Sequence, residues 1–397
     1  MASTQDLDNI RSLLKSLIDL TSQDDVLRDE KARGALLDAS RKLTAAISTP
    51  AERCISTMWS MFTFSAVRLA VALNLFGIIN DAGENAITAA ELADKCHAER
   101  ALVVRILRAL TGEQIVDEVG VEQYRTTPIC RHLTIPSVLA GIIHFYDQAM
   151  PSAAKLPEYF KSTSYRCPVK ANAGPFQFAN NTNLNSYAYW NKTGAAENFN
   201  TFMAGKFKAP VQWQDYYPVQ EELIGNRSEP VVFVDVGGGR GHELEVLKAK
   251  FPQTPWKMVL EDLPHVIDDN KGTLDESVEL LKHDMFTPQP IKGARAYFLR
   301  GILHNWPDED CRKILANIVP AMNKKSKILI HSQVLADMRA PMPGVWLDFG
   351  MMILHSGAER SEKQYSEIFE SVGLKFSKHI SSGYGEGVIE AVLQDAS

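Results

Sequence analysis

The chain has 397 residues, 45% of them hydrophobic, which is enough for two or three domains with a large core. Its formal net charge of −6 shows no basic excess, so the composition argues against nucleic acid as a partner. The 5 cysteines show neither metal-site nor disulfide spacing, and the N-terminus lacks the layout of a signal peptide, so we expect a reduced, cytoplasmic protein without a metal site.

Helical spacing of apolar residues marks the first part of the chain. Residues Leu7 to Ala46 alternate apolar and charged positions, which predicts one or two amphipathic helices that either lie against a partner subunit or form a solvated arm. The segment from Met58 to Ile79 is apolar on all sides, so we expect one continuous, buried helix. Because Arg68 and Asn74 interrupt it, a buried helix is favoured over a membrane span. Together the two segments predict a homodimer.

The next elements follow the order of a winged helix. A capping box at Thr88 and Glu91 opens a helix over Ala89 to Cys96, and a second helix follows over Ala101 to Leu110. Alternation over Ile115 to Tyr124 then predicts a small hairpin. A winged helix often binds DNA, but this one is poor in basic residues and belongs to an acidic protein. The arginines beside its second helix are Arg100, Arg105 and Arg108. A structural or dimer-forming wing is therefore favoured over a DNA-binding regulator.

Aromatic residues are frequent between Pro136 and Trp213. They are Phe145, Tyr146, Tyr159, Phe160, Phe176, Phe178, Tyr187, Tyr189, Trp190, Phe199, Phe202 and Trp213. Each one could belong to the core beneath a loop-rich connection, which is the commoner role for a single aromatic ring. Together they would also suit a pocket for a flat, apolar molecule.

From Val231 onward, strands alternate with helices, which predicts a parallel, doubly wound sheet. The expected strands are Val231 to Val236, Lys257 to Leu260, Val278 to Lys282, Ala296 to Leu299 and Lys327 to Leu335. The expected helices are His242 to Phe251, Pro264 to Asn270, one that starts at Pro307, Trp346 to Leu354, and one that follows a capping box at Ser361 and Gln364. An antiparallel hairpin around SSGYGEG is expected to close the chain at the sheet edge.

The loop after the first of these strands has the composition of a ligand site. Asp235 ends the apolar strand, and Gly237, Gly239 and Gly241 follow at a spacing of two. A dinucleotide fingerprint would need a further glycine where this chain has His242. The Asp235 carboxylate suits an ammonium group and would repel a pyrophosphate. With Asp262 at the position of a ribose-binding acid, the pattern indicates S-adenosylmethionine.

Six motifs then point to one family. They are VDVGGGRG (Val234–Gly241), EDLPHVI (Glu261–Ile267), HDMF (His283–Phe286), LRGILHNWPDE (Leu299–Glu309), FNTFM (Phe199–Met203) and GAERS (Gly357–Ser361). With them the chain resembles the S-adenosylmethionine-dependent O-methyltransferases of the plant and fungal type, most of all the fungal members that tailor polyketides and alkaloids. The resemblance implies a mostly helical, winged-helix dimerisation domain over residues 1–135, a helical linker and substrate segment over 136–225, and an α/β, Rossmann-like cofactor-binding domain over 226–397.

The resemblance also implies roles for single residues. The expected cofactor contacts are Gly237 on the methionine part, Asp262 on the ribose hydroxyls, Asp284 and Met285 beside the adenine, and Arg300, with Asp235, Gly239, Gly241 and Leu263 completing the site. The substrate pocket is expected to include His132, His144, Trp190, Phe199, Met203, Asp348 and Met352. His304 matches the general base of the family.

Around this base the sequence departs from the family. The acid that usually holds the histidine lies 28 residues farther on, where this chain has Ser332, and the usual aspartate after the histidine is Asn305. The second acid of the family is retained as Glu359. A serine cannot supply the negative charge that stabilises an imidazolium.

Two chemistries therefore stay open. In the first, the enzyme transfers a methyl group to a small aromatic or pyridone-like substrate, with His304 as base and Glu359 as its only acid partner. In the second, it resembles fungal pericyclases built on this scaffold, in which the sulfonium is not consumed and acts with Arg300 and His132 or His144 as a fixed charge. A non-enzymatic winged-helix regulator is the third alternative.

Overall fold

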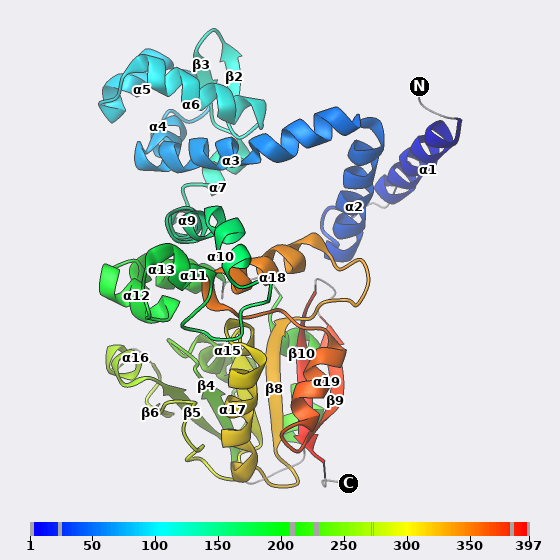
Figure 1. The fold of residues 1–397 in the computed structure, drawn as a ribbon, viewed down its shortest axis with the longest axis vertical. Helices are drawn as coiled ribbons and strands as arrows, with labels where there is room; N and C mark the ends of the chain where they lie inside the picture. Colours follow the sequence, from blue (N-terminus) through cyan, green and yellow to red (C-terminus); the bar gives the residue numbers. More distant parts are fainter. Residues whose placement is uncertain are drawn as a thin grey trace. The chain divides into compact units, whose positions relative to one another are not determined.

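The computed structural model describes residues 4–22, 26–206, 211–225, 230–270, 272, 274–381 and 385–394. The chain divides into two compact units, Met1–Ile142 and Ile143–Ser397 (Figure 1). The division lies after Ile142, within the helix α8 (Pro136–His144).

The N-terminal unit begins with four helices. They are α1 (Thr4–Thr21), α2 (Glu30–Ile47), α3 (Pro50–Ala72) and α4 (Leu75–Asp81). The amphipathic segment is therefore two helices. The expected continuous helix from Met58 to Ile79 is wrong, because Asn74 adopts a left-handed conformation with φ of 52° between α3 and α4. A capping box between Thr49 and Glu52 fixes the start of α3.

The first half of α3 is exposed in the single chain, which contradicts the expectation of burial. Met58, Trp59 and Phe62 each have a relative exposure of 60%. The apolar core of the unit takes up only the last turns of α3, through Ala66, Val67 and Ala70. By length and composition alone, α3 is the one helix in the described ranges that could cross a membrane.

The winged-helix order of the same unit is present. Its elements are β1 (Ile87–Thr88), α5 (Ala89–Cys96), α6 (Arg100–Gly112), β2 (Asp117–Gly120), β3 (Gln123–Arg125) and α7 (Pro128–His132). The three strands form a small antiparallel sheet in the order β1-β3-β2. The predicted capping box is confirmed, since the Thr88 hydroxyl accepts a hydrogen bond from the Glu91 amide and the Glu91 carboxylate accepts one from the Thr88 amide. Arg100 forms an ion pair of 2.5 Å with Glu122 of the wing.

The C-terminal unit starts with short helices. After α8 and a π-helical turn, η1 (Phe145–Ala149), they are α9 (Met150–Ala154), α10 (Leu156–Ser162), α11 (Pro175–Asn180), α12 (Ser186–Thr193), α13 (Ala196–Lys206), α14 (Trp213–Tyr216) and the π-helical turn η2 (Gln220–Ile224). Aromatic rings fill the space between several of them. Trp190 and Phe176 are fully buried and pack with Ile353 and Leu354 of a later helix.

A sheet of seven strands forms the rest of this unit, in the order β6-β5-β4-β7-β8-β10-β9. The strands are β4 (Val231–Val236), β5 (Trp256–Asp262), β6 (Val278–Lys282), β7 (Ala296–Arg300), β8 (Lys327–Gln333), β9 (Leu374–Ser381) and β10 (Glu386–Leu393). The first five are parallel, and β10 and β9 are antiparallel, so the Rossmann-like prediction is confirmed. The predicted hairpin places β9 at the sheet edge and β10 beside β8. Residues 382–384 of SSGYGEG lie outside the described residues.

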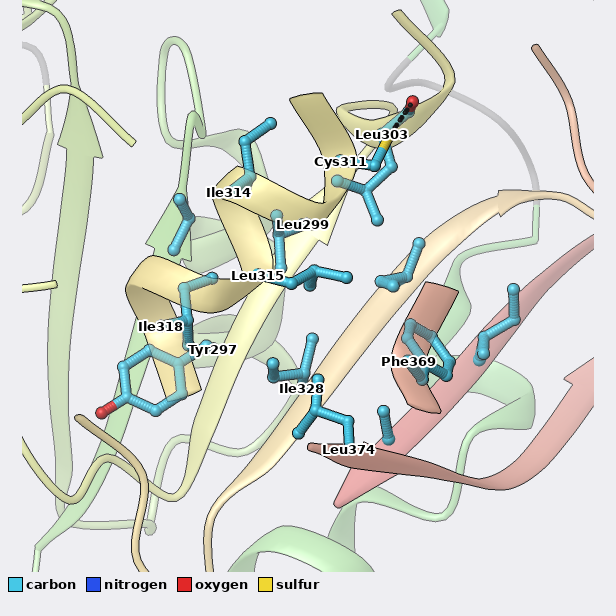
Figure 2. Close-up of a cluster of buried hydrophobic side chains, with 14 of the residues drawn as sticks. Tyr297, Leu299, Leu303, Cys311, Ile314, Leu315, Ile318, Ile328, Phe369 and Leu374 are labelled. Carbon is cyan, nitrogen blue, oxygen red and sulfur yellow. Dashed lines mark hydrogen bonds between the residues drawn. The ribbon is translucent and has the colours of Figure 1, made fainter. Parts of the chain in front are cut away.

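Helices cover both faces of this sheet. They are α15 (His242–Lys250), α16 (Pro264–Asp269), α17 (Asp308–Ile318) and α19 (Glu362–Glu370), with short 3₁₀ turns at η3 (Leu303–Asn305) and η4 (Val319–Ala321). The helix α18 (Met342–His355) packs instead against α9, α11 and η1. Tyr297 and Ile328 pack on one face with α17 and α19, as Figure 2 shows. Their neighbours Phe298 and Leu329 pack on the other face with α15 and Trp213. Because successive side chains alternate between two buried faces, these strands read as uninterrupted apolar runs.

Candidate functional site

The glycine-rich loop joins β4 to α15 at the carboxyl end of the sheet. Gly237, Gly239 and Gly241 all have positive φ angles, of 70°, 59° and 71°. The backbone conformation of Gly237 favours glycine, and a Cβ atom there would lie 2.8 Å from Cδ1 of Ile302, so that side chain would have to shift. The loop thus brings backbone close to the ends of β4 and β7, where parallel sheets of this kind bind ligands.

Asp262, at the end of β5, is tied to this loop. Its Oδ2 accepts a hydrogen bond of 2.9 Å from the Gly239 amide, and its Oδ1 accepts one of 2.7 Å from the amide of Leu263. Burial raises the pKa of Asp262, although these two amides act in the opposite direction. Each oxygen keeps a second lone pair, which is what two vicinal ribose hydroxyls would need.

Asp235 lies at the end of β4 and is almost completely buried, with 1% relative exposure. Neither of its carboxylate oxygens has a hydrogen-bond partner among the described residues. Burial raises the pKa of Asp235 to about 7, and the nearby Asp262 charge adds to this shift. A buried carboxyl group without a donor is rare and needs an explanation, which a bound cationic ligand would supply. The ammonium group of a methionine-type cofactor is a donor of the required charge.

The predicted adenine residues follow β6, which pairs with β5. The His283 amide donates to the Asp262 carbonyl over 2.9 Å, which joins the ends of these two strands. Asp284 is exposed, and its Oδ1 accepts a hydrogen bond of 3.0 Å from the Phe286 amide. Met285 is partly buried against the core. The structure therefore brings the cofactor residues of β4, β5 and β6 to one sheet edge.

Arg300 ends β7 and forms an ion pair with Glu243 of α15. Glu243 is 4% exposed and also accepts a hydrogen bond of 2.6 Å from the Trp213 indole. Sequence reasoning did not single out Glu243. The sequence feature that could have identified Glu243 is its place at the second position of a helix, near the core residues Leu244 and Leu247.

His304 lies in η3, directly after β7. Its Nδ1 donates a hydrogen bond of 2.5 Å to Oε1 of Glu359, whose side chain is completely buried. Ser332 of β8 donates a hydrogen bond of 3.1 Å to the other carboxylate oxygen, Oε2. Asp348 of α18 accepts a hydrogen bond of 2.9 Å from the Glu359 amide. The arrangement fixes the imidazole and leaves its Nε2 for another group.

The turn that carries His304 is held from several sides. Arg360 is buried, donates to the carbonyl of Leu303 over 3.0 Å and forms an ion pair of 2.7 Å with Asp308. Asn305 uses its side-chain amide to cap the Gly301 carbonyl over 2.8 Å. Asn305 therefore has a structural role here.

A small cavity of about 50 Å³ lies beside His304. It is lined by Met203, Arg300, Gly301, His304, His331, Ser332, Gln333, Leu347 and Glu386. The predicted residues Arg300, His304 and Met203 thus meet, whereas His331, Gln333 and Glu386 were not predicted. No group of three or more potential metal ligands occurs in the part of the chain that the structure describes.

The other predicted pocket residues lie elsewhere. His144, Trp190 and Phe199 form an aromatic cluster in which the His144 ring lies 4.5 Å from Trp190 and 5.3 Å from Phe199, and Met352 packs against it. Sequence reasoning did not single out His355, which joins this cluster by stacking on Tyr187 at 5.0 Å. Asp348 contacts the backbone amide of Glu359 and does not line the cavity. His132 ends α7 in the N-terminal unit.

Two buried histidines of this cluster predict an acid-sensitive fold. Burial lowers the pKa of His144 to about 4, and burial together with the charge of His304 lowers that of His355 to about 3. The unfolded chain therefore binds more protons below pH ~6.5, so stability is lost as the pH falls towards 4. The expected slope is about 1.4 kcal/mol of unfolding free energy per pH unit for each histidine.

Urea denaturation at pH 7.5 and pH 5 checks this expectation. His144→Phe should lose less stability than the wild type between the two pH values. Equal losses in both proteins would contradict the assignment of His144 as a buried neutral histidine.

Comparison with known proteins gives a consistent result. The chain matches the O-methyltransferase domain over residues 228–375 and the O-methyltransferase dimerisation domain over residues 56–135. It is 31% identical over 370 residues to the O-methyltransferase penC of Penicillium thymicola, which covers 92% of both chains. Two solved structures, LepI in complex with SAM and a pericyclic reaction enzyme, each have a TM-score of 0.87 and 27% identity, covering 98% of this chain and 100% of the other.

Proposed function

We propose, for a chain that belongs to the O-methyltransferase family, that it methylates a hydroxyl group of an aromatic polyketide or of a pyridone- or alkaloid-like small molecule. The methyl donor is S-adenosylmethionine. The observation that carries the proposal is the hydrogen bond between His304 and Glu359 beside a cavity at the carboxyl end of the sheet. The likeness to fungal O-methyltransferases such as penC supports the reaction type.

Different residues of the chain would bind different parts of the cofactor. Asp262, fixed by the Gly239 and Leu263 amides, would hold the ribose hydroxyls. Asp235 would accept hydrogen bonds from the ammonium group, and Gly237 would let the methionine part approach the backbone. Asp284 and Met285 would flank the adenine.

His304 would act as the general base. S-adenosylmethionine supplies an electrophilic methyl group on a positively charged sulfur. A phenol has a pKa of ~10 and is mostly neutral at pH 7, so its oxygen needs to lose a proton as the new bond to carbon forms. Nε2 of His304 accepts that proton, and the buried Glu359 carboxylate stabilises the imidazolium that results. The products are then the methyl ether of the substrate, S-adenosylhomocysteine as the leaving group, and the imidazolium of His304.

Substitutions of Ser332 test how much negative charge near His304 the proton transfer requires. Ser332→Glu places a second carboxylate beside Glu359, as in the family pattern, and we expect methyl transfer to rise severalfold. Ser332→Ala removes the hydrogen bond to Glu359 Oε2, and we expect a loss of severalfold. Initial rates at saturating cofactor measure both changes. A rate that falls with Ser332→Glu and is unchanged with Ser332→Ala would contradict the proposed support of Glu359.

A pericyclase reaction is the second candidate function. It is favoured by the likeness to a pericyclic reaction enzyme and by the replacement of the family acid with Ser332. In that reaction Arg300 would polarise a carbonyl of a quinone methide during dehydration or cyclisation, and no methyl group would leave the cofactor. His144 cannot serve as a charged partner at neutral pH, because burial lowers its pKa to about 4.

The dimerisation domain supports a homodimer. We propose that the exposed apolar face of α3 forms part of its interface, since Met58, Trp59 and Phe62 would otherwise face water. Phe62→Asp is expected to give the chain mass of 44.2 kDa in sedimentation at micromolar concentration, and the wild type twice that mass. Val121→Asp, at a fully exposed turn of the wing, is the control and should remain dimeric. A monomeric wild type would refute the proposal.

We also propose a cytoplasmic location without nucleic-acid or membrane partners. The support is the free state of all 5 cysteines and the acidic net charge of −6. A fluorescent fusion that collects in the secretory pathway, or a salt-dependent shift of DNA mobility, would contradict this proposal.

A further inference from the structure

The cavity beside His304 is lined by one permanently charged cation, Arg300, and one carboxylate, Glu386. A second carboxylate, Glu243, forms the ion pair with Arg300. Glu243 is 4% exposed and is anchored by the Trp213 indole, so this pair is fixed inside the protein. The positive charge of Arg300 is therefore already balanced before any substrate enters.

Glu386 lies on β10, which is separated from the Arg300 strand β7 by β8. It begins β10 and pairs in register with Gln333 of β8, which lines the same cavity. Burial lowers the pKa of Arg300, and the charges of Glu386 and then Asp235 act against that shift. Glu386 also contributes to the raised pKa of Tyr216, after the larger effect of burial. Both directions show that the Glu386 carboxylate lies close enough to Arg300 and Tyr216 to act on them electrostatically.

The size of the cavity limits what it can hold. A volume of about 50 Å³ is too small for an aromatic ring, which needs a cavity on the order of 150 Å³, but it exceeds the space of one water. It suits a small polar substituent of a substrate whose reacting hydroxyl lies at His304. Such a substituent could be a neutral carbonyl or hydroxyl, or a carboxylate.

We propose that Glu386 is a specificity-determining residue, which makes this cavity select an uncharged carbonyl or hydroxyl substituent and reject a carboxylate. The inference rests on the proposed function, because it names the substrate class of the same site. An entering carboxylate would meet the Glu386 carboxylate beside a guanidinium that Glu243 already neutralises, and the cavity would screen this repulsion less than water does. A neutral carbonyl or hydroxyl can accept a hydrogen bond from the side-chain amide of Gln333 without displacing either acid.

A matched pair of ligands tests this selection directly. Calorimetry on the dimeric protein loaded with S-adenosylhomocysteine would compare methyl 1-hydroxy-2-naphthoate with the free 1-hydroxy-2-naphthoate anion. The demethylated cofactor carries no sulfonium charge, so the side chains alone set the preference. We expect the ester to bind at least about tenfold more tightly than the acid.

Two variants decide the role of Glu386. Glu386→Gln keeps the shape of the side chain and removes its charge, so the preference for the ester should fall by about tenfold. Glu367→Gln makes the same change on the exposed side of α19 and should leave the preference as in the wild type. A wild type that binds both ligands equally, or a preference that Glu386→Gln does not change, would overturn the inference.

This outcome is separable from the reaction. Methyl transfer is followed with labelled cofactor and does not enter the binding ratio. A protein that prefers the ester but transfers no methyl group would support the inference about Glu386 and contradict the proposed function. A protein that transfers a methyl group but binds both ligands equally would support the proposed function and contradict the inference about Glu386.

Discussion

Replacing His304 by alanine is expected to lower kcat for methyl transfer by about 10²- to 10⁴-fold. The imidazole is the group that accepts the phenolic proton, and its Nδ1 is committed to Glu359 over 2.5 Å. Cofactor affinity should change little, because the residues proposed to hold the ammonium group, the ribose and the adenine lie at the carboxyl ends of β4, β5 and β6. Single-turnover transfer from a labelled donor, with titration calorimetry of the cofactor, measures the two quantities separately.

His379 offers a matched control for this prediction. Its Nδ1 donates to Glu362 over 2.8 Å, so it is also a histidine paired with a glutamate, but on the edge strand β9. His379→Ala should keep the wild-type rate. If both variants lose the same small factor, His304 is a structural histidine and the base lies elsewhere.

Replacing Asp262 by alanine is expected to weaken binding of both S-adenosylmethionine and its demethylated product by about 10²-fold. The carboxylate would bind two ribose hydroxyls and also holds the Gly239 amide, so its loss removes ligand contacts and frees the loop. Asp262→Asn keeps one acceptor oxygen and should lose less. Titration calorimetry with both ligands gives the affinities.

Asp269, an exposed acid at the end of α16, supplies the control, and Asp269→Ala should bind the cofactor as the wild type does. Undiminished affinity of Asp262→Ala would contradict the placement of the ribose. Loss of folding, seen as a lower Tm, would move the decision to the Asp262→Asn variant.

Much of the C-terminal fold could be predicted because its signals are local. Strands such as Val231–Val236 are buried on both faces and read as uninterrupted apolar runs. The capping boxes at Thr88 and Ser361 fix helix starts within a few residues of sequence. The position of Asp235 and Asp262 at strand ends could be predicted, and the topology of a parallel sheet collects ligand contacts there.

Other features depend on contacts that no local pattern contains. The pairing of Arg300 with Glu243 joins a strand end to a helix 57 positions earlier in the chain, and Glu386 reaches the same cavity from β10. The exposure of Trp59 on α3 could not be distinguished from burial, because an interface between subunits has the composition of a core. The aromatic residues around Trp190 pack together from several short helices, which no local pattern shows.

At Ser332 the sequence showed only part of what the structure shows. The missing acid was visible from spacing, but not the hydrogen bond by which the serine supports Glu359. The retained acid thus contacts both the proposed base and the residue that replaced its partner. This geometry supports the proposed proton transfer at His304 over the pericyclase alternative.

The most direct test of this account is incubation of the dimeric enzyme with S-adenosylmethionine that carries a deuterated methyl group and a panel of phenols and pyridone alcohols. Mass spectrometry should find a product that has exchanged one hydroxyl hydrogen for the labelled methyl group, together with an equal amount of S-adenosylhomocysteine. A product that is isomeric with its precursor, or lighter by one water, and that carries no deuterium while the cofactor stays intact would contradict methyl transfer.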